Sequence, residues 1–172
     1  MRRFVLPIVA TLIFYSESLF VQLFSSEIFG QHGVVVPHFL LILLLFIGIY
    51  KGQKTGFVYA IIFGFLFDFY FTGIIGIYLY LFPIVVYLVS QIMKLFDANV
   101  IVTSIVSFLG IILMDFAVFE LYSLLQKTSL SHTQFVEWRL LPTMIVNAIA
   151  LILMSMPLKT LLLKLKKIQE EE

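Results

Sequence analysis

The sequence contains no cysteine and few charged residues. Without cysteine the chain cannot form disulfides, thiolate metal sites or a lipid anchor on a cysteine. Only 12% of its 172 residues are charged, whereas 62% are hydrophobic. A soluble domain of this length cannot bury so large an apolar surface. The composition therefore excludes a soluble protein and predicts that lipid surrounds the chain.

The sequence also lacks the residue spacings that carry known chemistry. It has no HExxH zinc motif, no GxSxG nucleophile elbow and no phosphate-binding loop. The segment from Gly64 to Asp68 is not the GxGD arrangement of an intramembrane aspartyl protease. We therefore predict a protein that is not an enzyme and that uses no metal or cofactor. The net charge of +1 gives no reason to expect a nucleic-acid partner.

Six continuously apolar runs predict an all-helical membrane protein, a bundle of six transmembrane helices in a single domain, 1–172. Each run approaches the about 20 residues that a helix needs to cross the hydrocarbon. Continuous runs favour helices over barrel strands, which alternate in polarity. The predicted spans are about 4–24, 34–50, 56–71, 74–93, 99–125 and 140–158. Residues 159–172 are predicted to form a short tail, first basic and then acidic.

The positive charges predict the orientation of these spans. Nine of the 11 lysines and arginines lie at the termini or in alternate connections, which the positive-inside rule places in the cytoplasm. Only Lys127 and Arg139 fall in the other connections. We therefore expect both termini to be cytoplasmic. The nine are Arg2, Arg3, Lys51, Lys54, Lys94, Lys159, Lys164, Lys166 and Lys167.

Four acidic residues lie inside the predicted spans. Each costs at least about 2.5 kcal/mol there and so requires an explanation. Counting along the helices predicts that all four lie in the outer half, with Arg139, Lys127 and His38 as possible partners. They are either structural ion pairs or a functional cluster. The four are Glu17, Asp68, Asp115 and Glu120, and Asn147 lies at a similar depth.

Small residues recur every fourth position before Asp68. This spacing lets a second helix approach closely, so Asp68 is expected on a packed face. Gly73 and Gly76 then predict a tight outer turn. A buried acid under such a turn indicates a contact site. The ridge consists of Gly56, Ala60, Gly64, Asp68 and Thr72.

Several short motifs together resemble the rod shape-determining protein MreD family, in the form found in rod-shaped Gram-positive bacteria. The resemblance covers essentially the whole chain. It includes length, number of spans and the order of the motifs. Where the family has arginine after the proline of span two, this chain has His38. The matching residues are Ala60, Gly64, Asp68, Gly73 and Gly76, Ser16–Glu17–Ser18, Pro37–His38–Phe39, Arg139, Pro142, Thr143, Asn147 and Pro157.

The resemblance implies a non-catalytic scaffold of the cell-wall elongation complex in the bacterial cytoplasmic membrane. It implies direct binding of MreC, in a complex with MreB filaments, a RodA-type polymerase and a class B penicillin-binding protein. A cluster of Asp68, Glu17, Asp115, Arg139 and Asn147 would then organise the bundle or receive MreC.

Two other functions are compatible with a small helical bundle. The substrate-capture subunits of energy-coupling-factor vitamin transporters are also six-span proteins, and the MreD fold is expected to be similar. Those subunits have an A-x-x-x-A face on span one, whereas this chain has Ala10 followed by Phe14. An ion channel would need acids aligned through the membrane, but these acids are predicted in one half.

Overall fold

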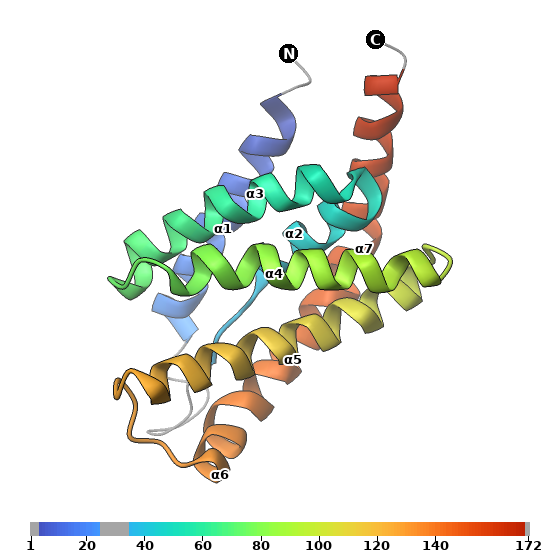
Figure 1. Cartoon of the computed structure of the whole chain (residues 1–172). Helices are drawn as coiled ribbons and strands as arrows, with labels where there is room; N and C mark the ends of the chain where they lie inside the picture. The colour runs from blue at the N-terminus through green and yellow to red at the C-terminus, as the bar shows by residue number, and fades with distance from the viewer. Residues whose placement is uncertain (1–3, 25–34, 171–172) are drawn as a thin grey trace.

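The computed structural model describes residues 4–24 and 35–170, which form helices and connections without a strand. Arg2, Arg3, the connection 25–34 and residues 171–172 lie outside this part, as does the predicted start of span two at Val34. Figure 1 shows α1 (Val5–Phe24), α2 (Phe39–Phe46), α3 (Gln53–Phe67), α4 (Ile77–Ile92), α5 (Val100–Leu124), α6 (His132–Phe135) and α7 (Leu141–Glu170). The π-helical turns η2 (Ile47–Lys51), η3 (Asp68–Thr72) and η5 (Val136–Leu140) extend α2, α3 and α6, and the 3-10 turn η4 (Met93–Leu95) ends α4.

The all-helical prediction is confirmed for the described residues, and the chain is a multi-pass membrane protein. Within this part, 5 helices are long and apolar enough to cross a membrane. The predicted second span is different, because α2 and η2 together cover only Phe39–Lys51. At about 1.5 Å per residue this helix is about 20 Å long, shorter than the about 30 Å hydrocarbon. Residues 35–38 before it are not helical. A sixth helix of spanning length is therefore not confirmed.

The last helix extends further in both directions than predicted. The apolar stretch His132–Ile168 forms one helical unit through α6, η5 and α7. The sixth span was predicted at 140–158, with a separate tail from 159. Instead, Leu158, Leu162 and Leu165 all remain buried, so packing continues along the predicted tail.

The connections alternate between two ends of the bundle. The connection between η2 and α3 and the one between α4 and α5 lie on the right of Figure 1. Lys51, Lys54 and Lys94 lie beside these connections, so we call this end the basic end. The α3–α4 and α5–α6 connections lie on the left of Figure 1, which we call the opposite end.

Helix α2 forms the centre of the bundle. Its sequence is apolar on every side, which is typical of a helix with no solvent-facing or lipid-facing surface. Every residue from Leu40 to Ile47 is at most 1% exposed. The helix contacts α1, α3, α4, α5 and α7. The other helices therefore assemble around α2.

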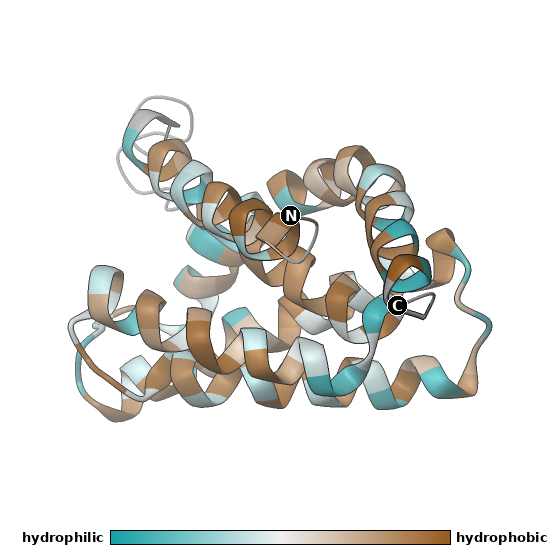
Figure 2. Ribbon diagram, turned by 90° about the horizontal axis from the view of Figure 1, so that it is seen from above, coloured by the Kyte–Doolittle hydropathy of each residue, from teal (hydrophilic) through white to brown (hydrophobic). Residues whose placement is uncertain are grey.

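The outer surface is apolar as well. Ile101 and Ile152 are 67% and 75% exposed, as expected for side chains that face lipid. Figure 2 shows hydrophobic residues along every long helix, with hydrophilic segments mainly near helix ends. The bundle thus has an apolar core and an apolar exterior, and the polar side chains described below lie between helices.

Glycines allow α3 to approach its neighbours. A Cβ atom on Gly64 would lie 2.5 Å from the carbonyl oxygen of Tyr78 in α4. A Cβ atom on Gly56 would lie 2.5 Å from the Cα atom of Gly48 in η2. Ala60, between these glycines, is fully buried. This face of α3 is therefore in backbone contact with α4 and η2.

Gly64→Ala is expected to destabilise the bundle by about 1–3 kcal/mol, because the added methyl group would meet backbone atoms that cannot rotate away. Helix propensity alone would predict the opposite sign, since alanine favours helices over glycine. Thermal unfolding in detergent measures the change. Ile62→Ala, at a position that is 50% exposed on the same helix, serves as the control. A melting temperature for Gly64→Ala at or above that of the native protein would contradict the close packing.

Candidate functional site

Asp68 binds the N-terminal end of helix α4. Its carboxylate accepts hydrogen bonds from the backbone N–H groups of Gly76, Tyr78 and Leu79 at 2.7, 2.9 and 3.0 Å. These are among the N–H groups that have no partner within their own helix. The negative charge also lies at the positive end of the α4 dipole. Asp68 is fully buried. Through these hydrogen bonds it caps α4, the next helix in the chain.

The tight turn before α4 makes this cap possible. Gly73 and Gly76 adopt φ angles of +64° and +125°, which are unfavourable for residues with a Cβ atom. The Thr72 hydroxyl donates to the Asp68 carbonyl at 3.1 Å and accepts the Ile74 N–H at 3.1 Å. The turn thus brings the start of α4 back over the end of α3.

Glu17 and Asn147 bind the start of the central helix in the same way. Glu17 of α1 accepts the Leu40 N–H at 2.9 Å, and Asn147 of α7 accepts the His38 N–H at 2.8 Å. Both side chains are buried. Two helices that are distant in sequence therefore supply partners for the α2 N-terminus.

The non-helical residues before α2 are hydrogen-bonded to α7. Thr143 Oγ1 accepts the Val36 N–H at 3.1 Å, and the Asn147 amide donates to the Val36 carbonyl at 3.0 Å. Non-helical backbone at membrane depth is tolerated only where other protein groups satisfy it. Thr143 and Asn147 lie four residues apart on one face of α7 and provide those groups. Thr143 belongs to the residues that carry the resemblance but not to the predicted cluster.

Asp115 and Arg139 form an ion pair between α5 and η5. The guanidinium binds the same carboxylate oxygen of Asp115 through Nε at 3.3 Å and Nη2 at 3.0 Å. Asp115 is fully buried and the Arg139 side chain is 21% exposed. The Nε2 atom of His38 lies 3.7 Å from this oxygen, which is too long for a hydrogen bond. The second carboxylate oxygen of Asp115 and both ring nitrogens of His38 have no hydrogen-bond partner among the described residues.

The predicted cluster therefore separates into helix caps and an ion pair. We use "polar cluster" for Asp68, Glu17, Asp115, Arg139 and Asn147. Asp115 and Arg139 are in direct contact, whereas Asn147 binds the His38 N–H and Glu17 binds the Leu40 N–H. Asp68 binds the start of α4 through the Tyr78 N–H group.

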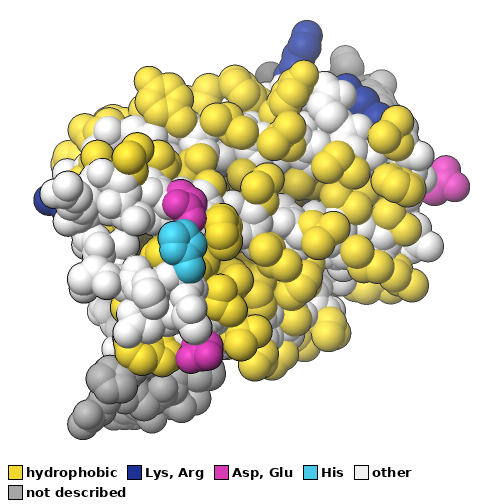
Figure 3. All heavy atoms as spheres, turned by 60° about the horizontal axis from the view of Figure 1, so that its bottom comes forward, with side chains coloured by type: hydrophobic (Ala, Val, Ile, Leu, Met, Phe, Trp, Pro, Cys, Tyr) yellow, Lys and Arg dark blue, Asp and Glu magenta, His cyan; other side chains and the backbone are white. Residues whose placement is uncertain are grey.

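Glu120 and His132 form a separate, exposed pair. Their side chains meet at 3.0 Å, with 47% of Glu120 and 69% of His132 exposed. Figure 3 shows a histidine beside an acidic side chain on this face, whose centre is largely hydrophobic. Lys127 makes no salt bridge with any acid in the described part of the chain. The predicted use of Lys127 as a partner is therefore not observed there.

These contacts join helices to one another. Within residues 4–24 and 35–170, no group of three His, Asp or Glu side chains gathers to hold a metal ion. The carboxylates of Asp68 and Glu17 instead accept backbone N–H groups. The chemistry of the polar cluster is thus hydrogen bonding and charge pairing between helices.

Asp68→Asn is expected to destabilise the protein by about 1–3 kcal/mol, because the amide has one acceptor oxygen where the carboxylate has two. Its NH₂ group would also face the N–H donors of α4. Thermal unfolding in detergent measures this loss. Asp97→Asn makes the same chemical change at an exposed position and should leave the melting temperature unchanged. Equal stability of the two variants would show that the cap contributes nothing.

Removing Arg139 alone is expected to cost more than removing both members of the ion pair. Arg139→Gln leaves a buried negative charge on Asp115, whereas the double variant with Asp115→Asn removes it. The single change should cost less than the about 3–5 kcal/mol of a fully buried pair, because Arg139 is 21% exposed. A double-mutant cycle on unfolding free energies measures the coupling. Additive effects would mean that the two charges do not stabilise each other.

Comparison with known proteins identifies a family. The family model of the rod shape-determining protein MreD matches residues 2–165. The chain is 33% identical over 172 residues to the rod shape-determining protein MreD of Bacillus subtilis (strain 168), covering 100% of both chains. No solved structure matches it, so the predicted likeness to transporter substrate-capture subunits is not confirmed. MreD is a shape-determining family and not a known enzyme family. The full-length match shows that this multi-pass membrane protein belongs to the MreD family.

Proposed function

We propose that the protein is a non-catalytic membrane scaffold of the bacterial elongation complex, which helps to couple MreB filaments to peptidoglycan synthesis and so controls cell shape. The observation that carries this proposal is the match along its whole length to a rod shape-determining protein. The internal use of the buried carboxylates supports a scaffold, because they bind other helices. A RodA-type polymerase and a class B penicillin-binding protein belong to the same proposed complex.

The proposed location is the cytoplasmic membrane, with both termini in the cytoplasm. The basic end would face the cytoplasm, because nine of the 11 lysines and arginines were assigned to that side from the sequence. The opposite end, with the Asp68 turn and the Glu120–His132 pair, would then face outward.

We propose that MreC binds directly at the opposite end. There, η3 exposes Phe69 and Tyr70, which are 64% and 62% exposed, immediately after the buried Asp68. Exposed aromatic side chains are common anchors of protein interfaces. The polar cluster shapes this surface from inside, because Asp68 holds the turn that follows these residues. Asp68 would thus affect partner binding through the shape of the bundle.

Affinity purification of the tagged protein from native membranes in mild detergent tests this function. MreC and wall-elongation enzymes are expected among the co-purified proteins identified by mass spectrometry. Recovery of a transmembrane coupling protein with two ATPases would instead indicate a vitamin importer and would overturn the scaffold proposal.

Two variants separate the surface from the fold. Phe69→Ala with Tyr70→Ala is expected to reduce MreC recovery at least tenfold, about 1.4 kcal/mol, and to lower the melting temperature less than Asp68→Lys, since of the two rings only Tyr70 contacts Phe14 of α1. Tyr80→Ala with Tyr87→Ala removes comparable exposed aromatic groups from α4 and is the control. Asp68→Lys should reduce both MreC recovery and stability. An intact complex with Asp68→Lys would contradict the role of the cluster.

A further inference from the structure

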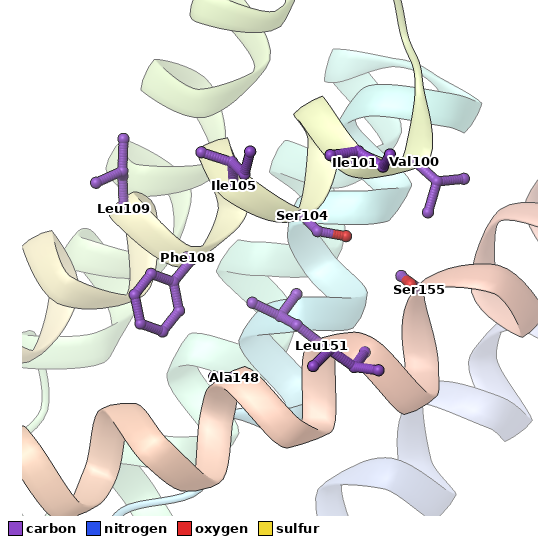
Figure 4. Close-up of a pocket in the computed structure, with 10 residues that line it drawn as sticks. Val100, Ile101, Ser104, Ile105, Phe108, Leu109, Ala148, Leu151 and Ser155 are labelled. Atoms are coloured by element: carbon purple, nitrogen blue, oxygen red, sulfur yellow. The ribbon is translucent and has the colours of Figure 1, made fainter.

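A groove between α5 and α7 opens on the outside of the bundle. It has a volume of about 430 Å³ and is lined by the first half of α5 and by residues 148–155 of α7. Figure 4 shows Ser104 on α5 and Ser155 on α7 on the two sides of this space, with Leu151 between the helices. Its other walls are apolar, and Ile105 and Leu109 on its rim are more than half exposed. The groove is therefore open to the hydrocarbon of the membrane.

The groove continues into a basic pocket at the same face. Val100 and Ile101 line both spaces, so the two are adjacent along α5. The second space, of about 700 Å³, is lined at its α7 side by Lys159, Thr160 and Lys164. No acidic residue lines either space. The apolar groove thus leads to the two positive charges of Lys159 and Lys164.

The position of Lys159 is defined by the core. Its Nζ atom lies 5.6 Å from the centre of the Tyr50 ring, a cation–π contact. Lys164 is exposed and makes no salt bridge within the described residues. The sequence explained both lysines only as topology signals. Because both lysines lie at the end of the groove, they also place positive charge where an anionic group of a bound molecule would lie.

We propose that this groove binds an anionic phospholipid, with an acyl chain between α5 and α7 and its phosphate at Lys159 and Lys164. Basic pockets between transmembrane helices favour anionic headgroups over zwitterionic ones. A transmembrane helix of a partner would fill the apolar part but would pair the two lysines only if it also carried acidic groups at this end, whereas every anionic phospholipid carries its charge next to its acyl chains. The combination of the apolar groove with the basic pocket therefore favours a lipid.

Native mass spectrometry of the full chain tests the headgroup preference. Phosphatidylglycerol and phosphatidylcholine with identical acyl chains are titrated separately into the detergent-purified protein. Lys159→Gln with Lys164→Gln should weaken phosphatidylglycerol binding by about fivefold per lysine, about 30-fold for both. Lys51→Gln with Lys54→Gln removes the same charge from the same end outside the groove and should leave binding unchanged. Equal binding of both lipids, or equal effects of both double variants, would overturn the proposal.

A substitution in the apolar part tests the acyl chain independently. Ser104→Leu fills the groove from α5 and should reduce phosphatidylglycerol binding at least tenfold while both lysines remain. Thermal unfolding confirms that this variant is folded, and Ser104→Ala is the conservative control. Unchanged lipid binding in folded Ser104→Leu would overturn the groove as the acyl site. Loss of MreC recovery in this variant, with lipid binding unchanged, would identify the groove as a protein interface instead.

Discussion

The structure depends on hydrogen bonds between acidic or amide side chains and helix N-termini that lie inside the bundle. A helix that begins within the membrane exposes N–H groups that water cannot reach. Asp68 satisfies such groups on α4, and Glu17 and Asn147 satisfy those on α2. Each of these side chains belongs to a different helix from the one it caps. The caps therefore stabilise the start of a helix and the contact between two helices at once.

The position of α2 follows from this arrangement. A short helix with no polar face is stable at the centre of a bundle only if its ends find partners there. Residues 35–38 reach those partners as non-helical chain, and four residues cover at most about 13 Å, at about 3.3 Å per residue. Added to the about 20 Å of the helix, this gives up to about 33 Å, which is enough to cover the about 30 Å of the hydrocarbon. The segment combines two backbone conformations where the other crossings are helical throughout.

The sequence predicts the class of this protein well and the details of its polar contacts poorly. Long apolar runs identify helices because the backbone has few alternatives in lipid. In the run 34–50 the valines before Pro37 are as apolar as the helix, so hydropathy alone does not show that the helix begins at Phe39. The pairing of Asp115 with Arg139 follows from opposite charge at similar depth. The partners of Glu17 and Asp68 are backbone N–H groups, which every residue has and no motif marks. Likewise, the lysines that follow residue 158 do not end α7, because Leu162 and Leu165 remain buried against the bundle.

The bonds between α7 and the segment before α2 also bear on how the chain assembles during synthesis. Val36 and His38 find their partners at Thr143 and Asn147, 107 to 111 residues later in the chain. When the first helices enter the bilayer, the helix that completes them has not yet left the ribosome. Until α7 is made, the backbone groups of Val36 and His38 lack the partners that they have in the finished bundle. The core of this protein closes with its last helix.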